Sequence, residues 1–234
     1  DAFHYVDRNY LTSTPMERIK QLFQSEKPIK WLFYGDSITH GALHTFGWRD
    51  YTEHFTERIR FEMNRRRDIV IKTAFSGNST KDLLEDFDWR VRQFQPHVVF
   101  IMIGMNDCSM GRNISPDEFR SNLKLLCRKI QEMSSAVPVL QTTCPILPGT
   151  SPDREPNFDA YMDIIRDVAT TEKAPLIDHT RYWKEKLAKQ SSLYFLMSDA
   201  FHPNQFGHQV FAELLFMDLD IFDQKSATCR FFHP

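Results

Sequence analysis

Short apolar runs alternate with helical patterns along most of this chain, and that alternation constrains its fold more than any other feature. Five runs bounded by turn-forming residues are typical of buried strands: residues 31–34, 69–75, 98–103, 137–143 and 175–177. Neighbouring parallel strands need crossover connections, which helices supply. The sequence therefore predicts an α/β fold, a three-layer α/β/α sandwich around a five-stranded parallel sheet, as in flavodoxin-like proteins.

Between these runs, apolar residues recur at spacings of three and four, which predicts amphipathic helices. The stripe from Trp48 to Met63 is regular, and residues 80–94 repeat it less cleanly. The motif Ser115-Pro-Asp-Glu118 has the form of a capping box with proline in the first turn, and it predicts the start of a helix. Further helices are expected at 158–168, at 206–219 and, after a second capping box at 14–17, near the N-terminus.

No internal repeat, low-complexity tract or linker divides the chain, and the proline-rich stretch 145–156 is interpreted as a loop. We therefore expect a single domain over residues 1–234, with a short N-terminal helical extension at about 1–29. Hydrophobic residues make up 41% of the chain, which excludes disorder. The longest apolar run, 98–103, is too short to span a membrane.

The formal net charge of −2, from 29 basic and 31 acidic residues, gives no global field that would attract nucleic acid or anionic lipid. The densest basic cluster, 65–67, is typical of a solvated helix C-terminus, where cations suit the helix dipole. We expect neither a nucleic-acid partner nor a membrane span, and the sequence leaves the oligomeric state open.

The four cysteines lack the spacing of a metal site or a disulfide framework. Cys127 and Cys144 fall inside apolar patterns, where a thiol usually acts as a small buried hydrophobic group. Reduced thiols favour a cytoplasmic protein. The chain begins at Asp1, however, so removal of a signal peptide and secretion stay open.

Polar motifs follow the predicted strands at the points where the strands end. They are Gly35-Asp-Ser-Ile-Thr-His-Gly41, Ser76-Gly-Asn78 and Gly104-Met-Asn-Asp107, and Ser198-Asp-Ala-Phe-His-Pro-Asn204 stands before the last helix. Ligands of such sheets bind beyond the carboxyl ends of the strands. Acyl transfer by a serine needs a nucleophile, a base, an orienting carboxylate and donors for the oxyanion. Each motif alone is a common turn, but the four in order indicate a hydrolase site.

Three other kinds of site fail on their patterns. An α/β-hydrolase elbow needs Gly-x-Ser-x-Gly, but the second residue after Ser37 is Thr39. A P-loop needs a Gly-Lys-Ser/Thr ending, which the chain lacks. A flavin phosphate would have to dock against the Asp36 carboxylate, which is unfavourable.

The four motifs resemble those of the SGNH, or GDSL-type, hydrolases, a family named after its serine, glycine, asparagine and histidine. The first motif has Ile38 where the family name has leucine, and the second has Asn78 where aspartate is frequent. The third matches Gly-x-Asn-Asp, and the last matches Asp-x-x-His-Pro with Gly207 following. The motifs span residues 35–207, so the resemblance covers the core and leaves both termini unexplained.

This resemblance implies a serine esterase with a Ser-His-Asp catalytic triad: Ser37 as nucleophile, His202 as base and Asp199 as the acid that orients the base. The oxyanion hole would consist of the backbone N–H groups of Ser37 and Gly77 and the side-chain amide of Asn106. Supporting residues would be Asp36, Gly104 and Asp107, the carboxylates holding the turns that aim Ser37 and Asn106.

We expect no metal and no cofactor. His208 lies on the last predicted helix without a second ligand nearby in sequence, and Asp178-His179 after the fifth strand is interpreted as structural rather than as a second acid–base pair.

Specificity should come from three loop segments around the site. Residues 40–49 contribute His44, Phe46, Trp48 and Arg49; residues 105–112 contribute Met110 and Arg112; the stretch before the last motif contributes Tyr194, Phe195 and Leu196. Members of the resembled family act on acetylated carbohydrates, lysophospholipids and short-chain or aryl esters. We expect a small-molecule or carbohydrate ester with a short acyl group, such as acetate. A lysophospholipase or thioesterase is the first alternative, and a non-catalytic carbohydrate-binding domain is the second.

Overall fold

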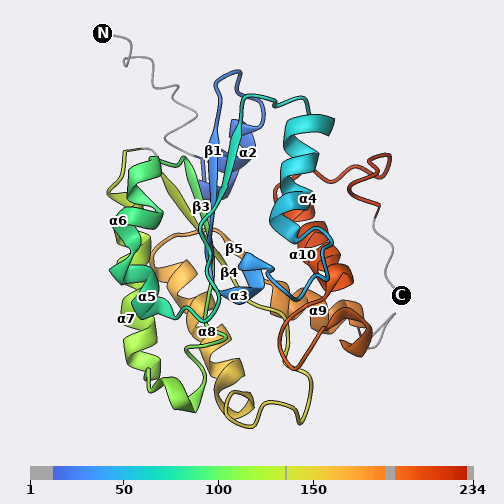
Figure 1. The fold of residues 1–234 in the computed structure, drawn as a ribbon. Coiled ribbons are helices and arrows are strands. Elements are labelled where there is room, and N and C mark those ends of the chain that lie inside the picture. The colour runs from blue at the N-terminus through green and yellow to red at the C-terminus, as the bar shows by residue number, and fades with distance from the viewer. Residues whose placement is uncertain (1–12, 135, 188–192, 231–234) are drawn as a thin grey trace.

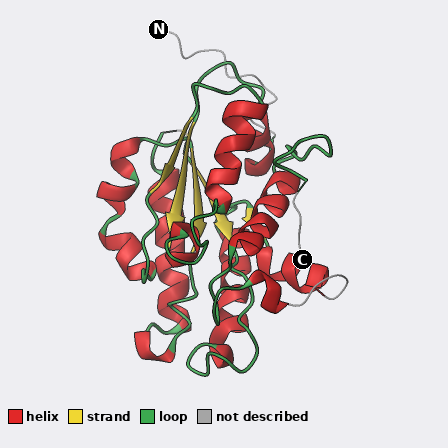
Figure 2. Cartoon of the chain, turned by 45° about the vertical axis from the view of Figure 1, so that its right-hand side comes forward, coloured by secondary structure: helices red, strands yellow, loops and turns green. Residues whose placement is uncertain are grey.

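The computed structural model describes residues 13–134, 136–187 and 193–230, so the first part of the predicted N-terminal extension lies outside the described residues. Its sheet has five parallel strands in the order β2-β1-β3-β4-β5. Figure 2 shows the strand arrows pointing toward one edge. The predicted α/β fold is confirmed. The strands are β1 (Lys30–Gly35), β2 (Ile69–Lys72), β3 (Val98–Met102), β4 (Val137–Gln141) and β5 (Leu176–Ile177).

Helices cover both faces of the sheet. Figure 1 shows α5, α6 and α7 on one side and α4 and α10 on the other, while α8 packs against α7 and α9 against α10. The α-helices are α2 (Pro15–Leu22), α3 (Ser37–His40), α4 (Tyr51–Glu57), α5 (Thr80–Glu85), α6 (Phe87–Arg90), α7 (Pro116–Gln131), α8 (Glu155–Thr171), α9 (His179–Leu187) and α10 (Gln205–Asp218).

The side chains of β1 alternate between the two helical layers, and those of residues 31–34 are fully buried. Trp31 and Phe33 face α4, and their rings lie 5.5 and 5.3 Å from the ring of Phe55. Tyr34 faces the other layer, where its hydroxyl donates to the carbonyl of Leu83 on α5 at 2.7 Å. Burial on both faces explains why β1 is a continuous apolar run rather than an alternating one.

β2 departs from the prediction of a buried strand because it lies at the edge of the sheet. Ile69 is 51% exposed, and the strand ends at Lys72 rather than at the predicted Phe75, which is 60% exposed. Beyond Lys72 the N–H of Thr73 still donates to β1, so the chain follows its neighbour without forming a regular ladder.

The predicted stripe 48–63 begins later than expected. Asp50 caps α4 by accepting hydrogen bonds from the backbone N–H groups of Thr52 and Glu53, so Trp48 lies before the helix and is 67% exposed. The last part of the stripe is a π-helix over Arg58–Glu62.

The predicted helix 80–94 is also interrupted, into α5, α6 and a 3₁₀ turn at Arg92–Phe94. Arg90 turns inward at the break, and its guanidinium donates to the carbonyl of Thr73 and to the side chain of Asn78. Because the charged side chain of Arg90 points into the domain from the otherwise apolar face of this stretch, the hydrophobic pattern of residues 80–94 is irregular.

In the basic cluster 65–67, Arg66 and Arg67 are exposed as expected, but Arg65 is not, which corrects the interpretation for that residue. The guanidinium of Arg65 pairs with Asp68 at 2.7 Å and donates to the carbonyls of Phe23, Ser25 and Lys27, which follow α2. Its side chain is only 10% exposed. Arg65 therefore ties the N-terminal segment to the body of the domain.

Helix α9 was not predicted, because its apolar residues are few: only His179, Thr180 and Trp183 are buried. All four cysteines are buried free thiols, as expected for Cys127 and Cys144. Among the described residues, no helix is both long enough and apolar enough to cross a bilayer.

Candidate active site

Ser37 is the first residue of the short helix α3, and one residue separates it from the end of β1. Asp36 caps this helix, and its Oδ1 accepts a hydrogen bond from the N–H of Ile38 at 2.9 Å. Gly35 allows β1 to approach β3 closely, since a Cβ at this position would lie 2.2 Å from the carbonyl oxygen of Met102. The turn places Ser37, 8% exposed, at the edge of the sheet where ligands were predicted to bind.

Three side chains of the first and last motifs form a continuous chain of hydrogen bonds. Ser37 Oγ lies 2.8 Å from His202 Nε2, and His202 Nδ1 lies 2.9 and 2.8 Å from the two carboxylate oxygens of Asp199. An ionised carboxylate only accepts, so the neutral ring carries its hydrogen on Nδ1 and Nε2 accepts from the serine hydroxyl. This arrangement can remove a proton from Ser37.

Burial and hydrogen bonding set the charge states of this group. Burial lowers the pKa of His202 below its usual value, and the neighbouring Asp199 opposes that shift only in part. For Asp199, burial acts to raise the pKa, but hydrogen bonds from Phe201 and His202 outweigh it and leave the pKa below its usual value. At neutral pH a neutral imidazole therefore lies beside an ionised carboxylate, the state needed in a general base.

The second and third motifs follow β2 and β3, the strands on either side of β1. The backbone of Gly77 has a φ of 84°, a left-handed conformation that favours glycine. Asn106 is 6% exposed, and its side-chain Nδ2 donates to the carbonyl of Asn78 at 2.9 Å. The topology thus brings the predicted oxyanion-hole residues to the same edge as Ser37.

The predicted supporting carboxylates are fully buried. Asp107 Oδ1 accepts from the N–H and the hydroxyl of Thr80 at 2.9 and 2.6 Å, which ties the third motif to the start of α5. Burial raises the pKa of Asp36 to about 7 and that of Asp107 to about 6. Gly104, with a φ of 122°, packs against Phe119 of α7.

Two further histidines are held by structural contacts. His179 Nε2 lies 3.0 Å from Oε1 of Gln141, and His208 Nδ1 accepts from the N–H of Tyr51 at 3.2 Å. Burial lowers the pKa of each to about 3. Asp178 forms a bidentate pair with Arg166 rather than an acid–base pair with its neighbour.

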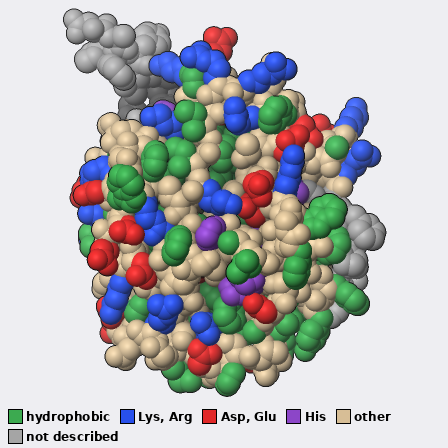
Figure 3. Space-filling view, in the orientation of Figure 1, with side chains coloured by type: hydrophobic (Ala, Val, Ile, Leu, Met, Phe, Trp, Pro, Cys, Tyr) green, Lys and Arg blue, Asp and Glu red, His purple; other side chains and the backbone are tan. Residues whose placement is uncertain are grey.

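Exposed large side chains come from the loop segments that were expected to set specificity. Figure 3 shows histidine side chains at the centre of the face seen in Figure 1, with hydrophobic side chains around them. Arg112 is turned back onto the second motif, where it donates to the carbonyl of Gly77 at 2.8 Å. The exposed aromatic and methionine side chains of these segments are Phe46, Trp48, Met110, Tyr194 and Phe195, each between 58% and 67% exposed. Leu43 is 89% exposed, whereas Leu196 is buried.

His44 is the residue whose place the sequence did not indicate. It was expected only to line the substrate loop, yet its ring stacks on the ring of His202 with a centroid separation of 3.6 Å. His44 lies outside all four motifs, and no spacing rule connects a loop residue to a ring brought in from the last motif.

Comparisons with known proteins agree with the motifs and the fold. The model of the GDSL-like Lipase/Acylhydrolase family matches residues 33–210. An acetylxylan esterase of Geobacillus stearothermophilus is 25% identical over 212 residues, which is 81% of this chain and 93% of that protein.

Two solved structures share the fold. LAE5, an alpha/beta hydrolase enzyme from the metagenome of Lake Arreo, Spain, superposes with a TM-score of 0.71 at 24% identity, over 84% of this chain and 97% of that chain. Axe2, an acetylxylan esterase of Geobacillus stearothermophilus, superposes with a TM-score of 0.70 at 22% identity, over 85% of this chain and 97% of that chain. Catalytic mutants of Axe2 replace a serine, an aspartate or a histidine with alanine.

Proposed function

The chain belongs to the GDSL-like lipase/acylhydrolase family and is a carboxylic ester hydrolase, and from this premise we propose that it works through a triad of Ser37, His202 and Asp199 on short-acyl esters of carbohydrates. The observation that carries the triad is the 2.8 Å contact between Ser37 Oγ and His202 Nε2, continued by Nδ1 to Asp199. The catalytic mutants of Axe2, in the same three residue types, support it.

The proposed reaction begins with attack of Ser37 Oγ on the ester carbonyl while the hydroxyl proton passes to His202 Nε2. Asp199 stabilises the imidazolium that forms. The carbonyl oxygen becomes an oxyanion, which accepts hydrogen bonds from the N–H groups of Ser37 and Gly77 and from the Asn106 amide. As the first residue of α3, Ser37 has an N–H without an acceptor inside the helix.

Collapse of this intermediate breaks the ester C–O bond, and the leaving alcohol takes the proton from His202. The acyl group is then bound to Ser37. A water molecule loses a proton to His202, attacks the acyl-enzyme and releases the carboxylic acid as the proton returns to Ser37 Oγ. No cofactor takes part, and every proton passes through one ring nitrogen.

The substrate class is supported by two observations. The acetylxylan esterase of Geobacillus stearothermophilus named above acts on an acetylated carbohydrate. The loop segments also expose Phe46, Trp48 and Tyr194, and aromatic faces of this kind can pack against the apolar face of a sugar ring.

The test combines a nucleophile variant with a panel of esters. Ser37→Ala should abolish turnover of nitrophenyl acetate in a folded protein, while Ser121→Ala on the outer face of α7 serves as control and keeps the wild-type rate. A fluorophosphonate should label Ser37, as mass spectrometry of the modified peptide would show. Retained turnover in folded Ser37→Ala would rule out this mechanism.

Chain length distinguishes the candidate substrates. Nitrophenyl esters from acetate to palmitate, assayed beside acetylated sugars, should give turnover restricted to the shortest acyl groups. A rate that rises with chain length would instead favour a lysophospholipase or thioesterase. Absence of turnover on every ester would favour a carbohydrate-binding domain.

A further inference from the structure

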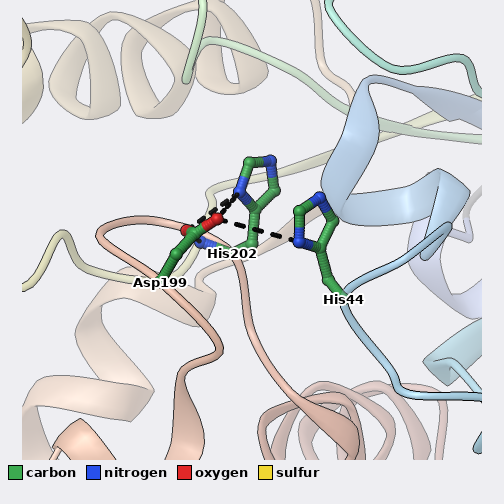
Figure 4. A group of neighbouring side chains, drawn as sticks. All are labelled: His44, Asp199 and His202. Carbon is green, nitrogen blue, oxygen red and sulfur yellow. Dashed lines mark hydrogen bonds and ion pairs between the residues drawn. The ribbon is translucent and has the colours of Figure 1, made fainter.

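A second imidazole faces the carboxylate of Asp199. His44 lies on the loop after α3, and its ring is parallel to that of His202 within 3°, at a centroid separation of 3.6 Å. Its Nδ1 lies 3.7 Å from Asp199 Oδ2. Figure 4 shows both rings with their Nδ1 edges turned toward Asp199 and their Nε2 edges turned away from it. One carboxylate therefore faces two stacked rings.

The position of Asp199 indicates which nitrogen of neutral His44 carries the hydrogen. An ionised carboxylate can only accept, and Asp199 Oδ2 lies 3.7 Å from His44 Nδ1. The hydroxyl oxygen of Ser198 lies 3.4 Å from the same nitrogen. The tautomer with its hydrogen on Nδ1, directed toward Ser198 and Asp199, is therefore the favoured one.

Two histidines and an aspartate are also ligands that zinc prefers, and their ligand atoms lie within 4.8 Å of one another. The ring geometry disfavours a shared ion. Ring lone pairs lie in the ring planes, and these planes are parallel within 3°, with the ring centroids 3.6 Å apart. An ion midway would lie out of both planes by nearly the whole length of a Zn–N bond, about 2.0 Å. The geometry of His44 and His202 therefore fits ring stacking and does not fit coordination of a shared zinc ion.

We propose that His44 is a positioning residue for ester hydrolysis: its ring holds the face of His202 so that the imidazole stays aligned with both Asp199 and Ser37. The inference rests on the proposed role of His202 as base. A ring free to rotate about its χ angles would lose either the 2.8 Å contact with Ser37 or the contact with Asp199. A flat partner in van der Waals contact restricts that rotation.

The two rings also compete for one negative charge. Burial and the positive charge that His202 can carry lower the pKa of His44, with Asp199 acting in the opposite direction. When His202 becomes an imidazolium during the reaction, a neutral His44 is required beside it, since two cations 3.6 Å apart would repel. Among the described residues, Arg154 acts on His202, and His40 and His208 interact with His44. Cys144 interacts with Asp199 and contacts the carbonyl of Phe201, next to His202.

Two substitutions distinguish the effect of the stacked ring of His44 from the effect of its ring nitrogens. His44→Ala removes the stacked partner, and His44→Phe keeps a flat ring but removes both nitrogens. Leu125→Ala, at a side chain of α7 that is 49% exposed and lies outside the loop segments, is the control. Nitrophenyl acetate is the substrate, because its small acyl group and planar alcohol limit contacts with the loop segments.

His44→Ala should lower kcat by about 10- to 100-fold with KM within about threefold of wild type, as expected for a misaligned base. His44→Phe should recover most of that loss. In both variants the acid limb of the kcat/KM profile should move to higher pH, because the Asp199 carboxylate no longer faces the N–H of His44 and stabilises the His202 imidazolium alone. The shift should be larger in His44→Ala, where water also reaches the His202 ring. Leu125→Ala should keep the wild-type profile.

Three results would overturn the inference: wild-type kcat and acid limb in His44→Ala, a loss confined to KM, or equal losses in the alanine and phenylalanine variants. Thermal melting checks that each variant is folded. If His44→Ala does not fold, the test is the acid limb of His44→Phe, and an unshifted acid limb in that variant would overturn the inference. Failure of the proposed function differs from all of these, since wild-type protein would then hydrolyse no ester and Ser37 would resist the fluorophosphonate.

Discussion

Asn106 has two hydrogens on its amide nitrogen, and one of them already has a partner. Nδ2 donates to the carbonyl of Asn78 at 2.9 Å, which fixes the plane of the amide. The second hydrogen remains for a ligand. This division explains how one side chain can be rigid before substrate arrives and still contribute a donor to the oxyanion, since a preorganised donor costs no reorganisation during the reaction.

Replacement of this residue should act on the rate rather than on binding. We predict that Asn106→Ala lowers kcat on nitrophenyl acetate by on the order of 10²–10³, the usual cost of one oxyanion donor, with a small change in KM. Asn157→Ala, which removes another amide with a backbone partner, Cys108, is the control and should keep kcat. A change confined to KM would mean that Asn106 only positions the substrate.

Asp36 offers a test of the electrostatics next to the nucleophile. Its Oδ1 caps α3, whereas its Oδ2 has no hydrogen-bond partner among the described residues. Burial, reinforced by the charge of Asp107, raises the pKa of Asp36 to about 7 in the folded protein. An aspartate in the unfolded chain has a pKa of about 3.9. Between these values the folded protein binds more protons than the unfolded one, so stability falls as pH rises.

Asp36→Asn keeps the cap and removes the titration. Relative to wild type, this variant should gain stability between pH 5 and pH 8 by on the order of 2–4 kcal/mol, measured from urea unfolding at each pH. Asp117→Asn, at an exposed carboxylate in the first turn of α7, is the control and should change the stability by less than about 1 kcal/mol at each pH. A pH-independent difference for Asp36→Asn would show that this carboxyl is not protonated in the fold.

At the scale of elements, the sequence predicted best where burial alone decides structure. Strands β1, β3 and β4 are buried on both sides, so an unbroken apolar run identifies each of them. The helix α7 was predicted from its cap at Ser115 and its stripe, and its stripe is buried as expected. Local sequence and tertiary environment favour the same structure in these elements.

Prediction failed where a tertiary contact competes with the local pattern. Arg90 breaks the helical stretch 80–94 because it is used inside the domain, and α9 has a weak apolar stripe because it packs largely through Trp183. His44 belongs to the same class, since nothing local places a loop histidine on a ring from the last motif. The motifs predicted which site residues share the sheet edge, but not the second layer of contacts around them.

At the scale of the whole molecule, the N-terminal segment is integrated more closely than an extension would be. Ile19 of α2 is fully buried, and the ring of Phe23 stacks on Trp31 of β1 at 4.8 Å. Asp68 joins the parts: it accepts from the N–H of Ile29 at 3.0 Å, from the indole of Trp31 at 2.8 Å and from Arg65. We therefore expect the segment and the sheet to unfold as one unit.

Asp68→Ala tests that expectation. The carboxylate is 2% exposed, and its loss leaves the Arg65 charge and two N–H groups without their acceptor, so the free energy of unfolding should fall by about 3–5 kcal/mol. Asp167→Ala, which breaks an exposed pair with Arg120, should cost about 1 kcal/mol or less.

Urea unfolding would be followed by tryptophan fluorescence and by esterase activity. In a single domain both probes give one coincident transition, shifted to lower urea in the variant. If Asp68→Ala instead loses structure around Trp31 in a separate early transition and keeps its activity, the N-terminal segment is an accessory that the ester hydrolase does not need.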